Sequence, residues 1–161
     1  MKLLTLFLSV IFLISFGCED PVQNEISDPD ILLEHNRAWW ESQGINSYQY
    51  QVTKFCYECW ASGIGEVIIT VEHNEIVEIK RLDYNTTVAE KYWIDFDTID
   101  ELFDIISSWL DSNPRIFEVE YHSIHGYPTF IEIDIGYSPD AEVQIVDAGV
   151  KVEVEDLTIL D

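Results

Sequence analysis

The chain has 161 residues and is strongly acidic: 31 Asp and Glu stand against 8 Lys and Arg, giving a formal net charge of −23. This charge repels phosphate backbones and anionic lipid headgroups, because Lys and Arg drive binding to both. The sequence therefore argues against a nucleic-acid partner. It favours cations or basic proteins as partners, although an acidic surface also serves solubility alone.

Residues 1–17 are predicted to be a signal peptide. Lys2 gives a positive start, residues 3–16 are almost entirely apolar, and Gly17-Cys18 is followed at once by acidic residues. The apolar run is short for a membrane span, which needs about 20 apolar residues. A small residue before a cysteine is typical of a bacterial lipoprotein signal. We therefore expect a lipid on Cys18 and attachment to a membrane of the cell envelope.

Two other fates remain open for this segment, namely secretion without lipid and an uncleaved anchor. Ser15 and Phe16 stand where the usual lipoprotein signal has Leu and a small residue, and Ser15-Phe16-Gly17 also fits ordinary secretory cleavage. The number of cysteines favours lipidation. If Cys18 carries lipid, Cys56 and Cys59 remain as a pair and no thiol is left over in an oxidising compartment.

A disulfide between Cys56 and Cys59 is the main prediction for that pair. It requires a turn, because an extended step of three residues spans about 10 Å and bridged Cα atoms lie within about 7 Å. A redox-active pair needs a thiolate of lowered pKa, usually at a helix N-terminus, and the residues after Cys59 predict no helix. Zinc would need two further ligands. Redox chemistry and zinc stay open as alternatives.

Residues 18–27 are polar and acidic and are predicted to form a flexible tether, with residues 28–161 as a single domain. Asp28-Pro29 predicts the start of a helix, with Asp as the cap, and Gly44 predicts its end.

One face of this helix carries Leu32, His35 and Trp39 at helical spacing, and we expect that face to be buried. Trp39 and Trp40 are neighbours, so their side chains point about 100° apart. At least one of the two should therefore be exposed or lie at the edge of a sheet.

After Ser47 the apolar residues recur with a period of two, which is typical of strands with one buried face. The alternate positions are often acidic, as in an antiparallel sheet with one solvated face. A hairpin turn is predicted at His73-Asn74. The predicted strands are residues 48–53, 66–72, 76–82, 117–121 and 131–135, then a stretch from Val143 through Gly149 to Val154.

A second helix is predicted from Thr98, because Thr98 and Glu101 form a capping box. Asn113-Pro114 predicts its end. Its apolar positions at helical spacing are Ile99, Leu102, Phe103, Ile106 and Leu110. Together these elements predict an α+β fold, an antiparallel β-sheet of six to seven strands with two helices packed on one face.

Four local features follow one another along the chain. They are the segment from Trp40 through Gly44 to Tyr50, the paired Cys56 and Cys59, the helix from Thr98 to Phe103, and the strand that runs into Gly126-Tyr127-Pro128 and residues 131–134. Together they resemble a family of small bacterial lipoproteins known only as domain of unknown function 6174. The resemblance implies an exported, lipid-anchored domain. It implies no particular activity.

Two groups of residues could bind a metal. Asp95, Asp97, Asp100 and Glu101 suggest calcium, although acids near a helix N-terminus are favoured by the helix dipole alone and the run lacks the Gly of a calcium loop. His122 and His125, with Asp134 on the next strand, could hold a metal, but histidines are common in turns. We therefore expect no metal and no cofactor.

The expected function is a non-enzymatic, lipid-anchored binding or assembly domain, because no group of residues converges on a catalytic arrangement. The partner could be a basic or envelope protein. Residues suggested for a binding surface are Trp40, Tyr127, His122 and His125. A thiol-redox lipoprotein using Cys56 and Cys59, and a calcium-binding envelope domain, are the alternatives.

Overall fold

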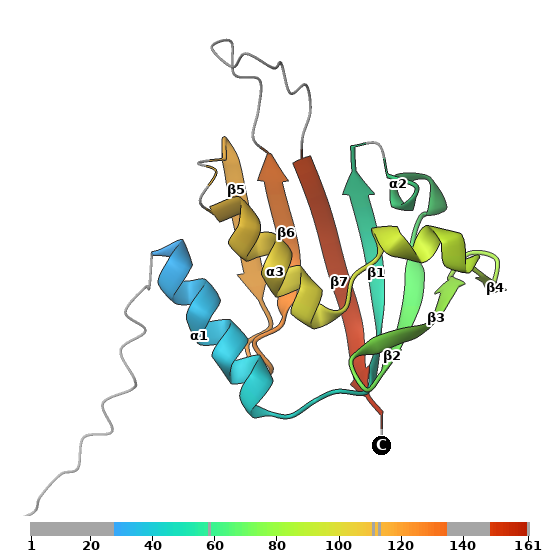
Figure 1. Ribbon diagram of the computed structural model, residues 1–161, viewed down its shortest axis with the longest axis horizontal. Coiled ribbons are helices and arrows are strands. Elements are labelled where there is room, and N and C mark those ends of the chain that lie inside the picture. The colour runs from blue at the N-terminus through green and yellow to red at the C-terminus, as the bar shows by residue number, and fades with distance from the viewer. Residues whose placement is uncertain (1–27, 58, 111, 113, 135–148, 161) are drawn as a thin grey trace, which may run out of the picture.

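A computed structural model describes residues 28–57, 59–110, 112, 114–134 and 149–160. Within these residues seven strands form one antiparallel sheet in the order β4-β3-β2-β1-β7-β6-β5 (Figure 1). The strands are β1 (Tyr48–Cys56), β2 (Val67–Glu72), β3 (Glu75–Arg81), β4 (Thr86–Thr87), β5 (Ile116–Tyr121), β6 (Pro128–Asp134) and β7 (Gly149–Ile159). The helices are α1 (Pro29–Ser42), α2 (Ala61–Ile64), the 3₁₀ helix η1 (Glu90–Asp95) and α3 (Ile99–Leu110).

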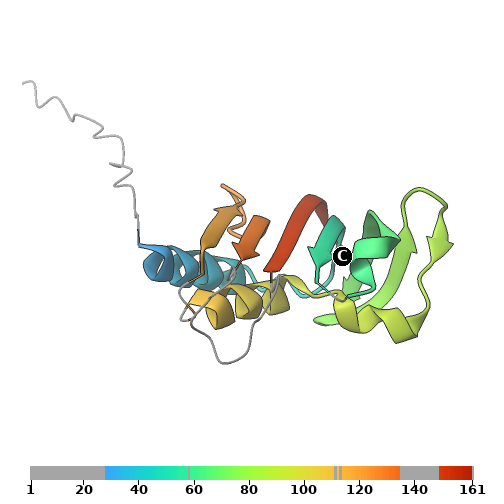
Figure 2. The same ribbon diagram turned by 90° about the horizontal axis from the view of Figure 1, so that it is seen from above.

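The two long helices lie on the same face of the sheet, over β5, β6 and β7, while η1 lies over the β1–β3 half (Figures 1 and 2). This confirms the predicted α+β architecture with α1 and α3 on one face. The C-terminal strand β7 inserts between β1 and β6, so the two halves of the chain join through the β1–β7 pair.

The period-two pattern corresponds to the buried face of the sheet, as predicted. Tyr48, Tyr50 and Val52 on β1 are buried, and Ile69 on β2 lies opposite Tyr50. The aromatic rings continue into the helical layer, where the Trp40 ring meets the Tyr48 ring edge to face at a centroid distance of 5.5 Å. The core therefore lies on the helical face of the sheet, under the two long helices and, on the β1–β3 half, beside η1.

The predicted turn and caps are also confirmed. His73 and Asn74 adopt left-handed backbone angles between β2 and β3. Asp28 caps α1 by accepting from the Asp30 N–H at 3.1 Å. At α3, Glu101 accepts from the Thr98 N–H at 2.7 Å and the Thr98 hydroxyl accepts from the Glu101 N–H at 3.2 Å, which is the reciprocal pair of a capping box.

The prediction of the buried face of α1 is wrong. Leu33 and Trp40 enter the core, whereas Leu32 is only partly buried and Trp39 is 50% exposed. Trp40 finds aromatic partners there and an acceptor for its indole N–H, since Nε1 donates to Asp100 Oδ1 at 2.9 Å. A buried tryptophan needs such an acceptor, and the face that offers one decides the rotation of the helix.

Other differences concern short elements. The short helices α2 and η1 and the two-residue strand β4 carry too few residues for a periodic signal, and β1 continues to Cys56. The predicted stretch at 143–148, the end of the strand predicted at 131–135, the signal peptide and the tether lie outside the described residues. Of the helices that the structure describes, none has both the length and the apolar character needed to cross a bilayer.

Candidate functional site

The acidic run before α3 does not form one site. Asp95 accepts from the backbone N–H of Trp60 at 2.7 Å, Asp97 pairs with Lys54, and Asp100 accepts from the Trp40 indole. Glu101 is the capping residue already described. The four carboxylates therefore have four different structural partners, and among the described residues they do not gather as a metal site.

The Lys54–Asp97 ion pair is the most buried charged feature of this region. The Lys54 side chain is 9% exposed and that of Asp97 is 16% exposed. Burial raises the pKa of Asp97 above its usual value, and the neighbouring Lys54 charge opposes that rise. The pair links the middle of the sheet to the segment between η1 and α3.

Two buried tyrosines complete this cluster. The Tyr50 hydroxyl donates to the Asp97 carbonyl, and the Tyr48 hydroxyl accepts from the Ile99 N–H at 2.9 Å. Burial raises the pKa of both phenols well above the usual range. Both hydroxyls therefore stay protonated at neutral pH and hold the start of α3 on β1.

The structure contains the predicted disulfide between Cys56 and Cys59, with Cα atoms 5.6 Å apart. The Ser62 hydroxyl accepts from the Cys56 N–H at 2.9 Å and donates to the Cys56 carbonyl at 2.7 Å, which fixes the turn. The short helix α2 follows the pair, contrary to the prediction that no helix does. Ser62, in its single turn, contacts both cysteines and so holds α2 at the end of β1.

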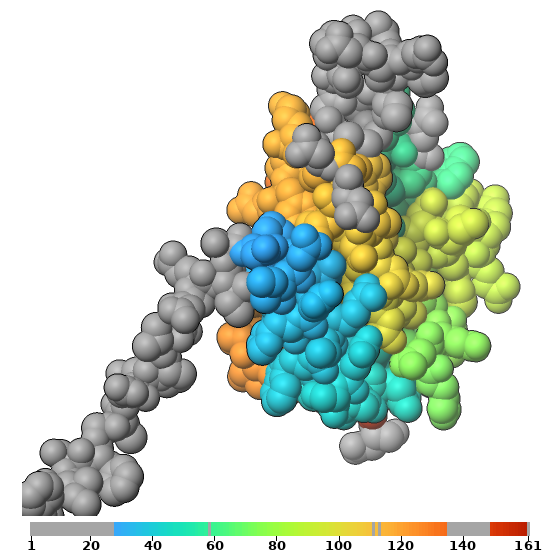
Figure 3. Space-filling model, turned by 60° about the vertical axis from the view of Figure 1, so that its left-hand side comes forward, coloured from blue at the N-terminus to red at the C-terminus, as the bar shows by residue number. Residues whose placement is uncertain are grey.

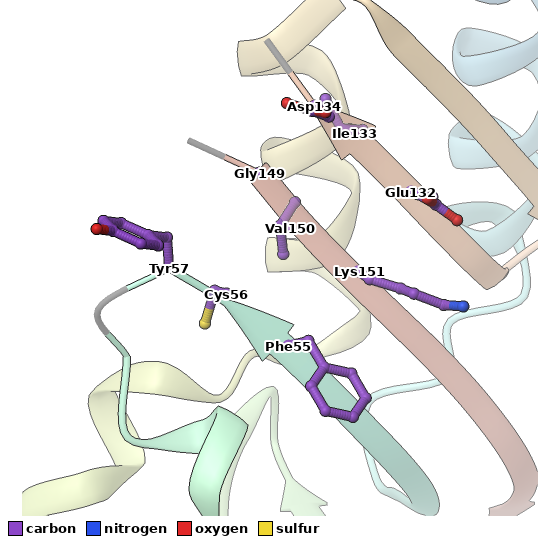
Figure 4. Close-up of a pocket in the computed structure, with 9 residues that line it drawn as sticks. All are labelled: Phe55, Cys56, Tyr57, Glu132, Ile133, Asp134, Gly149, Val150 and Lys151. Carbon is purple, nitrogen blue, oxygen red and sulfur yellow. The ribbon is translucent and has the colours of Figure 1, made fainter. Parts of the chain in front are cut away.

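A hollow of about 320 Å³ lies beside the disulfide, at the ends of β1, β6 and β7 (Figure 4). Phe55, Glu132 and Lys151 project from the face of the sheet away from α3. A hydrogen bond to Glu153 raises the pKa of Lys151, and nearby carboxylates add to the rise. The described wall ends at Asp134 and Gly149, and residues 135–148, which follow it, lie outside the described part of the chain.

The two predicted histidines lie in the turn between β5 and β6, where their rings stack at a centroid distance of 5.4 Å. His122 Nδ1 accepts from the His125 N–H at 3.2 Å, and His125 Nδ1 lies 2.7 Å from Gln43 Oε1. Asp134, the third suggested ligand, is at the other end of β6 and pairs with Arg115. Within the described residues no three His, Cys, Asp or Glu side chains gather as metal ligands.

Two residues suggested for a binding surface are in the core. Trp40 is only 2% exposed, and Tyr127 is buried between the Trp40 ring at 5.9 Å and the His122 ring at 4.7 Å. His122 and His125 lie half-buried at the rim. Of the adjacent tryptophans Trp39 and Trp40, the exposed one is Trp39, which the sequence pattern assigned to the core.

A groove runs between α1 and the edge strand β5. It consists of three adjoining hollows of about 490, 120 and 280 Å³, and neighbouring hollows share wall residues. Figure 3 faces this side of the molecule, where α1 lies between α3 and the orange of β5 and β6. The helix wall is Pro29, Leu32, His35, Asn36 and Trp39, and the strand wall is Phe117, Val119 and Tyr121. We call this feature the α1–β5 groove.

The turn at residues 122–126 closes one end of the α1–β5 groove and is fastened to α1. The Trp39 indole N–H donates to the Ile124 carbonyl at 2.8 Å. Gly126 has a φ of +76°, and a Cβ there would lie 3.0 Å from both the Asn36 carbonyl oxygen and Trp39 Cδ1. A glycine is therefore required for the turn to approach the helix.

The α1–β5 groove is rimmed by large apolar side chains that solvent reaches. Trp39 is 50% exposed and Ile124 is 66% exposed, and both line the largest of the three hollows. Burial raises the pKa of Tyr121, on the strand wall, to about 12, so its hydroxyl is neutral at physiological pH. The walls of the groove thus include many apolar side chains, in a protein of high negative charge, and Asp30 is the acidic residue among those that line its three hollows.

Residues 32–159 match the family of unknown function DUF6174. The chain belongs to this family. The match extends from Leu32 in α1 to Ile159 in β7 and so includes the strand wall of the α1–β5 groove and its helix wall from Leu32 onward; it confirms the family resemblance seen in the sequence. No curated protein matches the chain.

Sequence reasoning identified three residues of the helix wall, Leu32, His35 and Trp39, but assigned them to the core. Leu32 and Trp39 are apolar and recur at helical spacing with His35 between them, which is the signal of a buried face. The structure shows that α1 has a second stripe, Leu33 and Trp40, which enters the core. A helix with two apolar stripes and one buried face must expose the other.

Proposed function

We propose that this DUF6174 protein is a non-enzymatic binding domain, anchored to a membrane of the cell envelope by lipid on Cys18, which holds a partner protein in the α1–β5 groove. The observation that carries the proposal is the stripe of Leu32, His35 and Trp39 on α1, which faces an edge strand across a continuous groove and leaves Trp39 50% exposed. Exposed aromatic and aliphatic side chains gathered along one groove are typical of protein interfaces.

Many ionisable side chains are held in hydrogen bonds or ion pairs within the protein, which supports a role in binding over one in catalysis. The carboxylates of residues 95–101 hold structural partners, and the buried phenols of Tyr48 and Tyr50 are fixed in backbone hydrogen bonds. A catalytic group needs a free atom directed at the substrate, and the α1–β5 groove offers mainly apolar contact area.

The lipid anchor is supported by the sequence of residues 1–18 and by the cysteine count. With Cys56 and Cys59 joined in a disulfide, Cys18 is the remaining cysteine. A lipid supplies membrane attachment that an acidic protein cannot obtain from a basic patch.

The anchor is tested by the intact mass of the mature protein from its native host, with alkylation before and after reduction. Lipid mass on Cys18, and two thiols alkylated only after reduction, are expected. A lipid-free mass would indicate secretion. Two thiols alkylated without reduction would favour the redox alternative. Cys18→Ala serves as the control, because it should abolish the lipid mass alone.

The groove is tested in living cells with a photo-crosslinking amino acid placed at position 39 or 124. We expect one and the same protein to be crosslinked from both positions. Positions 60 and 94 are matched controls, because Trp60 and Ile94 are also exposed apolar residues and neither lines the groove. Equal crosslinking at all four positions, or none at 39 and 124, would contradict a binding role for the groove.

A further inference from the structure

The strand wall of the α1–β5 groove is also the edge of the sheet. In the described part of the chain β5 pairs with β6 on one side and with no strand on the other. An edge strand presents backbone N–H and C=O groups along its free side, and these can pair with one further strand. The groove therefore offers hydrogen-bonding groups beside its apolar surface.

The side chains of β5 separate by chemistry across the two faces of the sheet. Phe117, Val119 and Tyr121 lie on the helical face and line the groove, whereas Glu118 and Glu120 are exposed on the opposite face. A strand added to β5 would have the same alternation. Its side chains on one face would enter the groove beside Leu32 and Trp39, and those on the other would lie next to the two glutamates.

The two glutamates restrict the occupant. If a second copy of this chain paired antiparallel through β5 about Val119, Glu118 of each copy would lie opposite Glu120 of the other, and like charges opposite each other destabilise a strand pair. The chain's own segment 18–27 carries Glu19, Asp20 and Glu25 and no Lys or Arg, so it meets the same repulsion. A segment with Lys or Arg at alternate positions complements the edge.

We infer that the α1–β5 groove receives an extended, basic segment of a partner protein, which pairs with β5 as an eighth strand of the sheet. Alternate apolar side chains of this segment fill the groove, and the intervening Lys or Arg side chains lie beside Glu118 and Glu120. Backbone pairing supplies general affinity, while the alternation supplies specificity. The inference rests on the proposed function and names the chemistry of its partner.

The test uses the full mature protein and synthetic peptides of about eight residues, a length that covers an edge strand. The first peptide alternates lysine with valine, and the second alternates glutamate with valine. The third has the same sequence as the first and is made in two versions. In each version the backbone nitrogens along one edge of the peptide carry methyl groups, so that this edge cannot donate hydrogen bonds to β5. Binding is measured by calorimetry, and hydrogen exchange of the β5 amides reports where each peptide binds.

We expect the lysine–valine peptide to bind and to protect the amides of β5, the glutamate–valine peptide to bind at least about tenfold more weakly, and the methylated peptide to lose a similar factor. The double variant Glu118→Lys/Glu120→Lys should reverse the preference between the two charged peptides. The control Glu72→Lys/Glu75→Lys changes the net charge equally, at exposed positions of the distant β2–β3 hairpin, and should leave the preference unchanged.

Several results would overturn the inference. If the methylated peptide bound as tightly as the lysine–valine peptide, strand pairing would be excluded. If the two double variants changed the preference between the charged peptides equally, that preference would depend on the net charge of the protein and not on Glu118 and Glu120. Protection of β5 without peptide, rising with protein concentration, would assign the groove to a second copy. Such protection independent of concentration would assign it to residues 18–27.

This outcome is separable from that of the proposed function. If positions 39 and 124 crosslink to one partner in cells but no lysine–valine peptide binds, the groove is a binding site for a surface other than a basic strand, and only the inference fails. If neither the crosslinks nor peptide binding is observed, both fail.

Discussion

The buried ion pair between Lys54 and Asp97 gives the sharpest test of how the fold is held together. Lys54→Met keeps the length and apolar stem of the side chain and removes its charge. The Asp97 side chain is only 16% exposed, so the carboxylate would be left in a poorly hydrated place without its partner. Removing one member of a buried pair typically costs about 3–5 kcal/mol. For a domain of this size the melting temperature should fall by roughly 10–20 °C.

The pH dependence of that loss follows from the raised pKa of Asp97. Because burial raises the pKa in the folded protein, the folded state binds the proton more tightly than the unfolded state, and stability from this group is lost as the pH rises through the interval between the two pKa values. Lys54→Met removes the charge that opposes the rise, so the interval extends upward. The stability difference between wild type and Lys54→Met should therefore shrink as the pH is lowered from about 7 to about 5.

The assay is urea unfolding followed by tryptophan fluorescence at several pH values. Lys80→Met is the matched control, because Lys80 pairs with Glu78 on the surface, where an ion pair contributes about 1 kcal/mol or less. The double variant Lys54→Met/Asp97→Leu should recover much of the stability lost by Lys54→Met alone. A loss for Lys54→Met no larger than for Lys80→Met, or one independent of pH, would refute the argument from burial.

Three further variants test local features of the fold. Gly126→Ala should cost about 1–3 kcal/mol more than Gly44→Ala, since both have positive φ but only Gly126 has α1 atoms where a Cβ would lie; thermal melts of both variants measure the difference. Thr98→Ala should lower the free energy of unfolding by about 1 kcal/mol through loss of the capping box, seen as a shifted urea midpoint at constant slope. Replacing Cys56 and Cys59 by Ser should cost about 2 kcal/mol or less, because the disulfide closes a short loop, and a complete loss of folding would contradict this.

The parts of the fold that the sequence predicted are those decided within a few residues. The capping box joins Thr98 to Glu101, the turn at His73-Asn74 needs left-handed angles that Asn tolerates, and the alternation along β1 repeats every second residue. These interactions depend little on distant segments. Their sequence signals are therefore sufficient.

The parts that it could not predict depend on segments far apart in the chain. Pairing of β7 between β1 and β6 brings Val152 opposite Lys54, about a hundred residues earlier, and no local pattern encodes that choice. The rotation of α1 is decided by Asp100 and Tyr48, which receive Trp40. The candidate site could not be predicted for the same reason, because the groove forms only where α1, whose rotation is set by the core, lies beside the edge strand β5.

The adjacent tryptophans of α1 separate the two roles of the helix, and this leads to a last prediction. Trp40 is buried and its indole N–H is bonded to Asp100, so Trp40→Ala should cost about 3–5 kcal/mol. The Trp39 side chain is half exposed, and its indole N–H donates to the Ile124 carbonyl at the rim. Trp39→Ala should therefore cost clearly less, about 1–2 kcal/mol, and should weaken peptide binding as well. Urea unfolding and calorimetry on the same two proteins measure both effects. If Trp39→Ala destabilised the protein as much as Trp40→Ala, the stripe that lines the groove would be part of the core, and its exposure could no longer be explained by binding.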